Sequence, residues 1–330
     1  MTPQTPAELR CRTLLRRTVQ IFLLFTVVAT ASGAPDRAGA PPFRFAFSAR
    51  MFSGVNENDA KAAIKVWSQN LAKERKIPLA PQPLLLQSRA EIIEALHSKR
   101  VEAVSLATDE YLALAPEFHA THLLVSSIAG HTSEQYLLLV HSKSPYSSPA
   151  DLKGRSLLLS DNVRASLSVI WLDVTLAKEG LGSVARHFGQ VREAKKLTAV
   201  VLPVFFRQQD ACVVSRSGFK IMCELNPQIR AQLKPLATSP EVVPAFTFIR
   251  PDFRESLGDE IIAEVLSMQN TESGKQILTL FQTDHLEQLP ARVLDSAREL
   301  IEAHKRLIPP PSGDPGGALQ FSPKNPQASP

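Results

Sequence analysis

An alternation of short apolar strands with amphipathic helices is the feature that most constrains the fold. Strands are predicted at 43–47, 83–87 and 101–105, and the segments 59–76 and 89–100 between them carry apolar residues at helical spacing. Asp59 and Ser88 are predicted to cap these two helices. Strands joined by single helices pair in parallel through right-handed crossovers. Ligands bind at the carboxyl ends of such strands, which here predicts binding loops at 48–56 and 105–111.

A second strand–helix series follows. Its predicted strands are 123–129, 136–141, 156–159, 187–191 and 211–214. Its predicted helices are 166–179, 192–206 and 218–226, the second of which contains Pro203. Segments 233–238 and 245–249 read as extended, and from Asp252 onward the pattern is wholly helical.

The two series predict an α/β fold with two lobes, each a mainly parallel sheet flanked by helices, with a ligand cleft between them. The first lobe takes residues 43–132 and 236–307, and the second takes 133–235. Crossings are expected near 130–136 and 235–245. Residues 308–330 are rich in Pro, Gly and Ser, which predicts a disordered tail.

The first 34 residues read as a secretory signal peptide. Four arginines precede an apolar stretch at 19–29, and small residues follow, with cleavage expected after Ala31 or Ala34. The alternative is an uncleaved membrane anchor. No Cys follows the apolar stretch, so no lipid anchor is expected, and the mature protein is predicted to be soluble outside the cytoplasm.

Charge gives no reason to expect a nucleic-acid partner. The segment 1–34 contains four arginines and one glutamate, a formal charge of +3, so its removal leaves +2 of the +5 of the whole chain.

The four histidines at 119, 122, 131 and 141 lack Cys or carboxylate partners at the spacing of metal ligands. We therefore predict no metal site and no cofactor.

Two cysteines remain after processing, Cys212 and Cys223. A strand at 211–215 followed by a returning helix at 217–226 can bring the two sulfurs to a similar height. In an oxidising compartment a Cys212–Cys223 disulfide is then one alternative, and two buried thiols are the other.

A polar loop at the start of the helix predicted at 166–179 is a candidate anion site. It follows the apolar strand 156–159 and carries Ser160, Asp161, Asn162, Arg164 and Ser166. A helix start offers unpaired N–H groups and the positive end of the helix dipole. Hydroxyl groups and an arginine at that point suit a small anion.

Several segments, in this order, resemble the phosphonate-binding family of ABC-transporter solute receptors, a type 2 class of periplasmic binding protein. They are 45–48, 101–112, 151–155, 164–167, 206–215 and 236–240. The resemblance covers roughly residues 43–300. It implies a two-lobed receptor that closes on a phosphonate-like or phosphate-like anion and passes it to a membrane permease.

The family's phosphonate cradle is changed in this chain. The resemblance implies a helix start rich in hydroxyl groups, but the matching positions are Arg164, Ala165, Ser166 and Leu167, with one hydroxyl. Arginine can replace neutral donors with a bidentate contact. The family also places a histidine on the next loop, where this chain has Lys195 or Lys196 as a substitute charge or as ordinary surface lysines.

Further ligand contacts are expected from loops at strand ends. The candidates are Ser48, Arg50, Met51, Phe52, Ser105, Thr108, Tyr111, Tyr136, Asp210 and Ser215. Tyr136 can stack on a ligand and donate its hydroxyl, or it can be a core aromatic. Asp210 can meet a ligand amine or serve as a turn residue.

The predicted function is a monomeric periplasmic solute-binding protein for a small anion, with an ABC permease as its partner. The ligand would stabilise hinge closure by contacting both lobes. One alternative is a receptor that reports to a membrane signalling partner. Another is an enzyme of the two-lobed pyrimidine-precursor synthase type, although the chain has no Ser-His-Asp order, Cys-His pair or paired carboxylates at a strand end.

Overall fold

Two β-sheets organise the chain, which the computed structural model describes over residues 42–253 and 255–309. The first sheet consists of β1 (Phe45–Ser48), β2 (Leu84–Leu86), β3 (Ala103–Ala107), β4 (His122–Ser127), β10 (Ala245–Ile249) and β11 (His285–Pro290). The second consists of β5 (Tyr136–His141), β6 (Ser156–Ser160), β7 (Gln190–Ala194), β8 (Ala211–Ser215) and β9 (Leu233–Thr238).

The strand orders are β11-β4-β10-β3-β1-β2 and β7-β6-β8-β5-β9. β1 pairs in parallel with β2 and β3, and β6 pairs in parallel with β7 and β8, as the crossovers predict. The other pairs are antiparallel. The α/β prediction is confirmed, with sheets that are mixed rather than mainly parallel.

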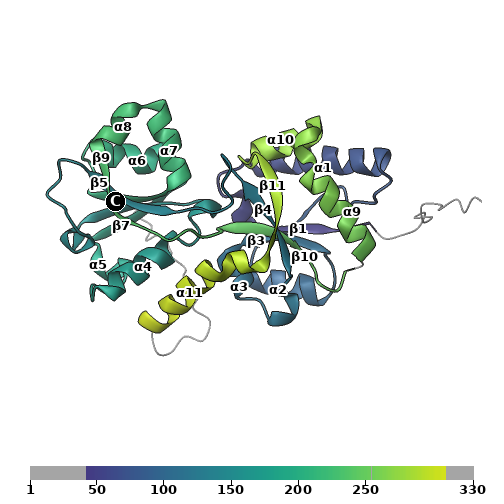
Figure 1. Ribbon diagram of the computed structural model, residues 1–330, viewed down its shortest axis with the longest axis horizontal. Coiled ribbons are helices and arrows are strands. Elements are labelled where there is room, and N and C mark those ends of the chain that lie inside the picture. Colours follow the sequence, from purple (N-terminus) through teal and green to yellow (C-terminus); the bar gives the residue numbers. More distant parts are fainter. Residues whose placement is uncertain (1–41, 254, 310–330) are drawn as a thin grey trace, which may run out of the picture. The chain divides into compact units, whose positions relative to one another are not determined.

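Helices cover both sheets (Figure 1). Next to the first are α1 (Glu57–Glu74), α2 (Arg89–His97), α3 (Thr108–Leu112), α9 (Glu255–Leu266) and α10 (Glu272–Leu280). Next to the second are α4 (Ser168–Lys178), α5 (Val184–His187), α6 (Leu197–Phe205), α7 (Arg216–Leu225), α8 (Pro227–Gln232) and α11 (Asp295–Leu307). Short 3₁₀ turns include η1 (Ala49–Phe52), η4 (Val163–Ala165) and η5 (Met268–Asn270).

Two helices next to the first sheet, α1 and α2, start at side-chain caps. The predicted Ser88 cap of α2 is confirmed, because its hydroxyl accepts from the Glu91 N–H at 3.2 Å. The predicted Asp59 cap of α1 is wrong. Asn56 caps this helix instead, accepting from the N–H groups of Asn58 and Asp59, so that α1 begins earlier than expected.

Two edge strands differ from the sequence predictions. The strand expected at 187–191 lies at Gln190–Ala194, where it pairs with β6, and α6 therefore begins only at Leu197. The wholly helical pattern expected after Asp252 is interrupted by β11, which pairs with β4. Both strands are rich in polar residues, so their place in a ladder comes from partners distant in the sequence.

The chain crosses between the sheets three times. β9 pairs with β5 in the second sheet, and β10 pairs with β3 and β4 in the first. After β11, helix α11 packs on α4 of the second lobe, where Ala297 and Leu300 join the core around Trp171. The range 236–307, expected in the first lobe, thus has its first residues and its last helix beside the second sheet.

A buried polar pair fixes α11 to α4. Asp173 is 4% exposed, and one of its carboxylate oxygens lies 2.9 Å from Nε2 of His304. The other oxygen accepts from the N–H of Val184 at 2.7 Å. Both oxygens of this buried carboxylate therefore have partners.

Cys212 and Cys223 are both free and buried, so the disulfide alternative is wrong and the buried-thiol alternative is confirmed. Both side chains belong to the apolar cluster between β8, α6 and α7. Burial raises the pKa of the Cys212 thiol to about 12, which keeps it protonated at neutral pH.

The predicted signal peptide lies outside the described residues, as does the predicted tail except for Ile308 and Pro309. Within the described part, no helix is both long and apolar enough to cross a membrane.

Gly189 occupies a position where a side chain does not fit. A Cβ atom there would lie 2.4 Å from the carbonyl oxygen of Gly154, in the turn before β6. We expect Gly189→Ala to lower the free energy of unfolding by about 1–3 kcal/mol, because backbone must move to admit the methyl group. Urea denaturation measures the change.

The matched control is Gly258→Ala in α9, where the new methyl group meets only the Phe253 ring at 3.8 Å. For Gly258→Ala we expect the free energy of unfolding to stay the same or to rise by up to about 1 kcal/mol, since alanine is more stable than glycine inside a helix. Equal stability of Gly189→Ala and the unmodified protein would contradict this packing.

Candidate ligand-binding site

The end of β1 and the turn η1 bring Ser48 and Arg50 beside α3. The Ser48 hydroxyl donates to Oε1 of Glu110 at 2.7 Å, and Nη1 of Arg50 lies 2.6 Å from Oδ2 of Asp109. Burial lowers the pKa of Arg50, but the carboxylates of Asp109, Glu110 and Asp161 outweigh it, so the net shift is upward. Arg50 is therefore a permanently charged group at a strand's carboxyl end.

The backbone N–H groups between η4 and α4 are already used inside the protein. The N–H of Ala165 donates to Asn162 Oδ1 at 3.1 Å, and that of Ser166 donates to the Val163 carbonyl at 3.2 Å. The N–H of Leu167 reaches the Tyr136 hydroxyl at 3.4 Å. An anion at this point would have to be held mainly by side chains.

Arg164 projects from η4 toward the end of α10. Its Nη2 donates to the carbonyls of Phe281 and Gln282, at 3.2 and 2.5 Å. These carbonyls lie at the negative end of a helix dipole, which favours a cation. Arg164 has no ion-pair partner within 4 Å among the residues the structure describes. Burial lowers its pKa, opposed by the charges of Glu134 and Asp284.

The turns η1 and η4 lie next to each other. A Cβ atom on Gly54, just after η1, would lie 4.0 Å from Cβ of Asn162, just before η4. The charges of Arg50 and Asp161 also interact. The turns after the carboxyl ends of β1 and β6, one from each sheet, thus lie close together.

Other predicted residues around the first sheet serve the core. The Tyr111 hydroxyl accepts from the Ala120 N–H at 2.8 Å, and its ring packs against Phe246. The Thr108 hydroxyl donates to the Val243 carbonyl, and the Ser105 hydroxyl bonds to that of Thr247. These contacts tie the three side chains into the fold around the first sheet.

Among the predicted residues near η1 and η4, some are buried in the core and others keep polar groups at the meeting point of the two turns. Met51 is partly exposed within η1, whereas Phe52 is buried against Phe281. Tyr136 is fully buried in the second core, and burial raises the pKa of its hydroxyl. Ala165 and Leu167 are buried, and the Ser166 hydroxyl donates to the Pro244 carbonyl at 3.0 Å. The structure brings Ser48, Arg50 and Arg164 to the meeting point as polar candidates.

The remaining predicted residues have local roles. Ser215 caps α7 by accepting from the Gly218 N–H at 3.1 Å. Lys195 is exposed in the bend between β7 and α6. Asp210 accepts from the Tyr146 hydroxyl at 2.6 Å and from Ser156 N–H at 3.0 Å, at the opposite end of β8 from Ser215. Asp210 is thus a structural residue.

Asp210→Asn is expected to destabilise the fold by about 1–3 kcal/mol at neutral pH, because three donors on Tyr146 and Ser156 lose a charged acceptor. Burial raises the pKa of Asp210, but hydrogen bonds from Tyr146 and Ser156 lower it by more than burial raises it. The net shift of this pKa is therefore downward. A carboxyl group whose pKa is lower in the folded state stabilises the fold at pH values above its unfolded-state pKa. This stabilisation is lost as the pH falls through the pKa of the folded state.

The difference between the Asp210→Asn variant and the unmodified protein should therefore shrink below about pH 4, in chemical denaturation repeated across pH. A difference that stays constant down to about pH 2 would contradict this role for the carboxylate.

Sequence reasoning missed several acidic groups at the site. Asp109 and Glu110 follow the β3 strand end, where their position alone could have marked them. Glu134 is buried and accepts from both the N–H and the hydroxyl of Ser217. The carbonyls of Phe281 and Gln282 carry no sequence signal. Within the described residues, no group of three His, Cys, Asp or Glu side chains is placed to hold a metal ion.

Several solved structures have a similar fold. A Pseudomonas aeruginosa binding-protein component of an ABC phosphonate transporter is 15% identical, with TM-score 0.54, covering 81% of this chain and 87% of its own. PhnD1 from Prochlorococcus marinus, in complex with methylphosphonate, is 15% identical, with TM-score 0.55, covering 79% and 98%. A chloride-bound Xanthomonas citri protein is 16% identical, with TM-score 0.58, covering 80% and 98%. At these identities the likeness establishes the two-lobed fold.

No curated protein matches the sequence. A family model, described as the phosphonate periplasmic substrate-binding protein of ABC transporters, matches residues 51–291. This match covers most of the chain, including both sheets except β1. The chain therefore belongs to the phosphonate-binding family of periplasmic substrate-binding proteins of ABC transporters.

Proposed function

We propose that this protein is a periplasmic receptor that binds a small oxyanion of the phosphonate type and delivers it to an ABC permease. The observation that carries the proposal is the approach of η1 and η4, the two turns that carry Arg50 and Arg164. Each arginine comes from a different lobe, so an oxyanion that contacts both would favour a closed arrangement. We expect the receptor to work as a monomer.

The acidic groups near Arg50 restrict the chemical class of the proposed ligand further. Asp109, Glu110 and Asp161 all contribute to the electrostatic environment of Arg50, and Oδ1 of Asp109 is buried with no hydrogen-bond partner among the described residues. A buried acceptor without a donor is costly. We therefore propose that the ligand carries a hydrogen-bond donor, such as a protonated oxygen or an ammonium group, in addition to its oxyanion.

A thermal-shift screen tests the proposed function. Methylphosphonate, phosphate, sulfate and an aminoalkylphosphonate are compared with neutral and cationic solutes at equal ionic strength. A ligand at about 100 times its dissociation constant stabilises the folded state by about 2.7 kcal/mol, which raises the melting temperature measurably. We expect at least one oxyanion to do so. Stabilisation by a neutral or purely cationic solute alone would overturn the oxyanion proposal.

A receptor that reports to a membrane signalling partner would use the same site. The family consists of substrate-binding proteins of transporters. Membership in it favours a function in transport over a function in signalling and over an enzymatic function. A permease and an ATPase encoded beside this chain would support transport, and a membrane sensor encoded there instead would support signalling.

A further inference from the structure

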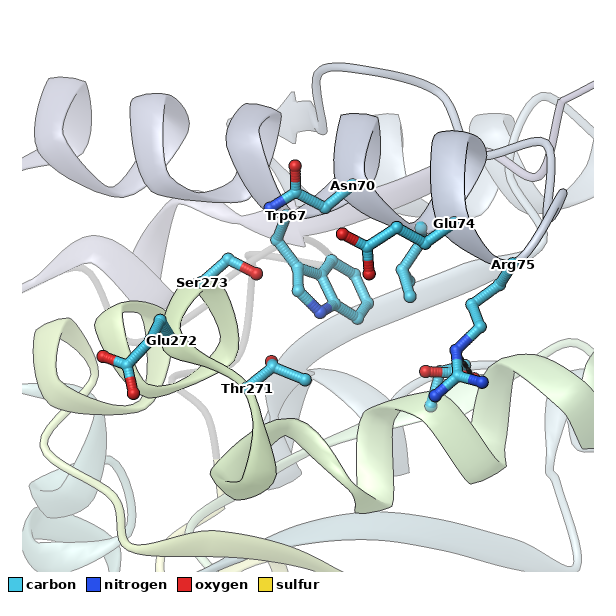
Figure 2. Close-up of a pocket in the computed structure, with 9 residues that line it drawn as sticks. Trp67, Asn70, Glu74, Arg75, Thr271, Glu272 and Ser273 are labelled. Atoms are coloured by element: carbon cyan, nitrogen blue, oxygen red, sulfur yellow. Dashed lines mark ion pairs between the residues drawn. The ribbon is translucent and has the colours of Figure 1, made fainter.

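A cavity of about 210 Å³ lies between α1 and the start of α10, formed entirely by elements of the first lobe. Its lining includes Trp67, Asn70, Glu74, Arg75, Glu264 and Ser273. Figure 2 shows the indole of Trp67 between α1 and the segment of residues 271–273, with Asn70 and Glu74 beside it. None of these residues belongs to the proposed oxyanion site.

Trp67 provides an apolar wall with one unused polar atom. The residue is 7% exposed, and its indole N–H has no hydrogen-bond acceptor among residues 42–253 and 255–309. The indole nitrogen is not one of the fully buried atoms without a partner, so the N–H is open to solvent in the cavity. Its position in the cavity lining makes the N–H available to an acceptor on a bound molecule.

The carboxylates around the cavity are not equivalent. Glu264 lies 3.2 Å from Nε of Arg75, and Glu272 lies 2.8 Å from Nζ of Lys275. Glu74 has no ion-pair or hydrogen-bond partner within the described part of the chain. One uncompensated negative charge therefore stands beside the indole, where a cation would be attracted by both the carboxylate and the aromatic face.

We propose that this cavity binds a small organic ammonium compound that also carries a hydrogen-bond acceptor, such as a hydroxyl group. The cation lies near Glu74 and the Trp67 ring, and the acceptor takes the indole N–H. The hydroxyl of Ser273 and the amide of Asn70 have no hydrogen-bond partners among the described side chains and add further polar contacts. An apolar wall with a few convergent polar groups is the usual composition of a ligand pocket.

The cavity is smaller than the roughly 300–1,000 Å³ of pockets for drug-sized ligands. It therefore suits a compound with few non-hydrogen atoms, and choline is a suitable probe. The neutral isostere 3,3-dimethylbutan-1-ol has the same shape and hydroxyl group without the charge, so the pair isolates the contribution of the cation.

Nuclear magnetic resonance of the ¹⁵N-labelled full chain tests the proposal. The sequence has two tryptophans, Trp67 and Trp171, so two indole N–H resonances are expected, and Trp67→Phe identifies the first by its loss. Choline should shift the Trp67 resonance saturably and leave that of Trp171, which is buried in the other core, unchanged. The neutral isostere should bind at least about tenfold more weakly.

Glu74→Gln should weaken choline binding at least about fivefold, whereas Glu57→Gln, on the same helix outside the cavity, should leave it unchanged. An unmoved Trp67 resonance at about 50 mM choline, equal binding of the isostere, or unaltered binding by Glu74→Gln would each overturn the proposal. Arg50→Ala should bind choline normally, which separates this site from the oxyanion site.

Discussion

Arg50→Ala is expected to weaken oxyanion binding by about 100-fold. The change removes a charge-assisted contact worth roughly 1.5–3 kcal/mol and leaves the carboxylate of Asp109 facing the ligand without its counter-ion. Repulsion from Asp109 adds to the lost attraction, which makes this the largest expected effect on affinity. Isothermal titration with the oxyanion that stabilises the protein most measures the loss.

Two variants serve as controls for Arg50→Ala. Arg50→Lys keeps the charge but loses the planar fork, so we expect an intermediate affinity. Lys61→Ala removes a cation that pairs with Glu57 on the surface of α1, and it should bind as the unmodified protein does. Full affinity of Arg50→Ala would remove this arginine from the site, and full affinity of Arg164→Ala would remove the other.

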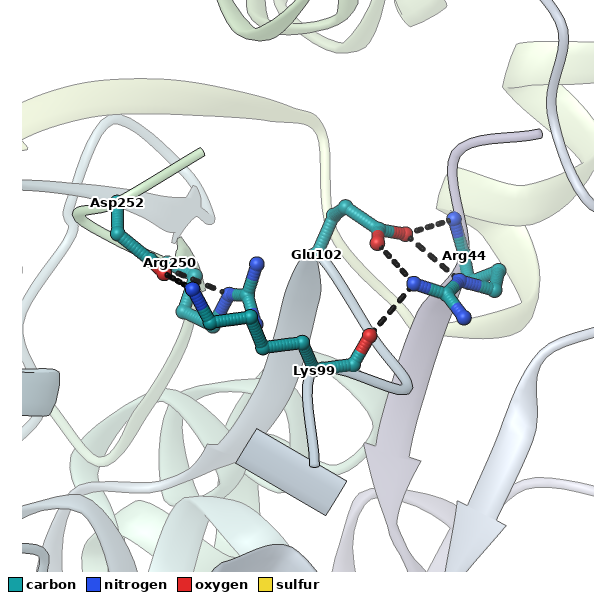
Figure 3. Close-up of polar contacts among 5 residues, drawn as sticks. All are labelled: Arg44, Lys99, Glu102, Arg250 and Asp252. Carbon is teal, nitrogen blue, oxygen red and sulfur yellow. Dashed lines mark hydrogen bonds and ion pairs between the residues drawn. The ribbon is translucent and has the colours of Figure 1, made fainter. Parts of the chain in front are cut away.

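Glu102→Ala is expected to cause the largest loss of stability, about 2–4 kcal/mol, because a buried carboxylate is lost from several hydrogen bonds while the Arg44 side chain left behind is 43% exposed. Glu102 is 6% exposed, and its carboxylate accepts from the N–H of Arg44 and from the Arg44 guanidinium (Figure 3). The same guanidinium donates to the Lys99 carbonyl at 2.6 Å. Without Glu102, the backbone at the start of β1 loses its acceptor and Arg44 loses its counter-ion. Urea denaturation gives the change.

The neighbouring pair in Figure 3 supplies the control. Lys99 contacts Asp252 at 2.8 Å, but both side chains are largely exposed to solvent. We expect Lys99→Ala to change stability by less than about 1 kcal/mol, as is usual for surface ion pairs. A Glu102→Ala variant as stable as Lys99→Ala would show that the Arg44–Glu102 contact is not needed for the fold.

The buried parts of the fold could be predicted because their sequence signals are local. β5 coincides with the predicted strand 136–141, whose residues are all buried, and Ser88 caps α2 as expected. β7 and β11 could not be placed in this way. Their residues are largely polar and partly exposed, and they are strands because β6 and β4 offer ladders to them.

The candidate site was predictable in position but not in detail. Arg50 and Arg164 lie at strand ends, where the topology predicts ligand contacts. Their partners come from distant segments: Arg164 bonds to carbonyls more than one hundred residues away. The role of Asp210 also depends on a distant residue: the hydroxyl of Tyr146, 64 residues earlier in the chain, donates to its carboxylate and gives it a structural role. Strand-end position does not distinguish a free side chain from one that a distant partner already occupies.

Isothermal titration of the purified protein with methylphosphonate, phosphate, sulfate and an aminoalkylphosphonate tests the central claim most directly. We predict one-to-one binding of at least one of these oxyanions, and loss of that binding in Arg50→Ala and in Arg164→Ala. Absence of binding by every oxyanion, together with saturable one-to-one binding of a neutral solute that both arginine variants retain, would contradict the account.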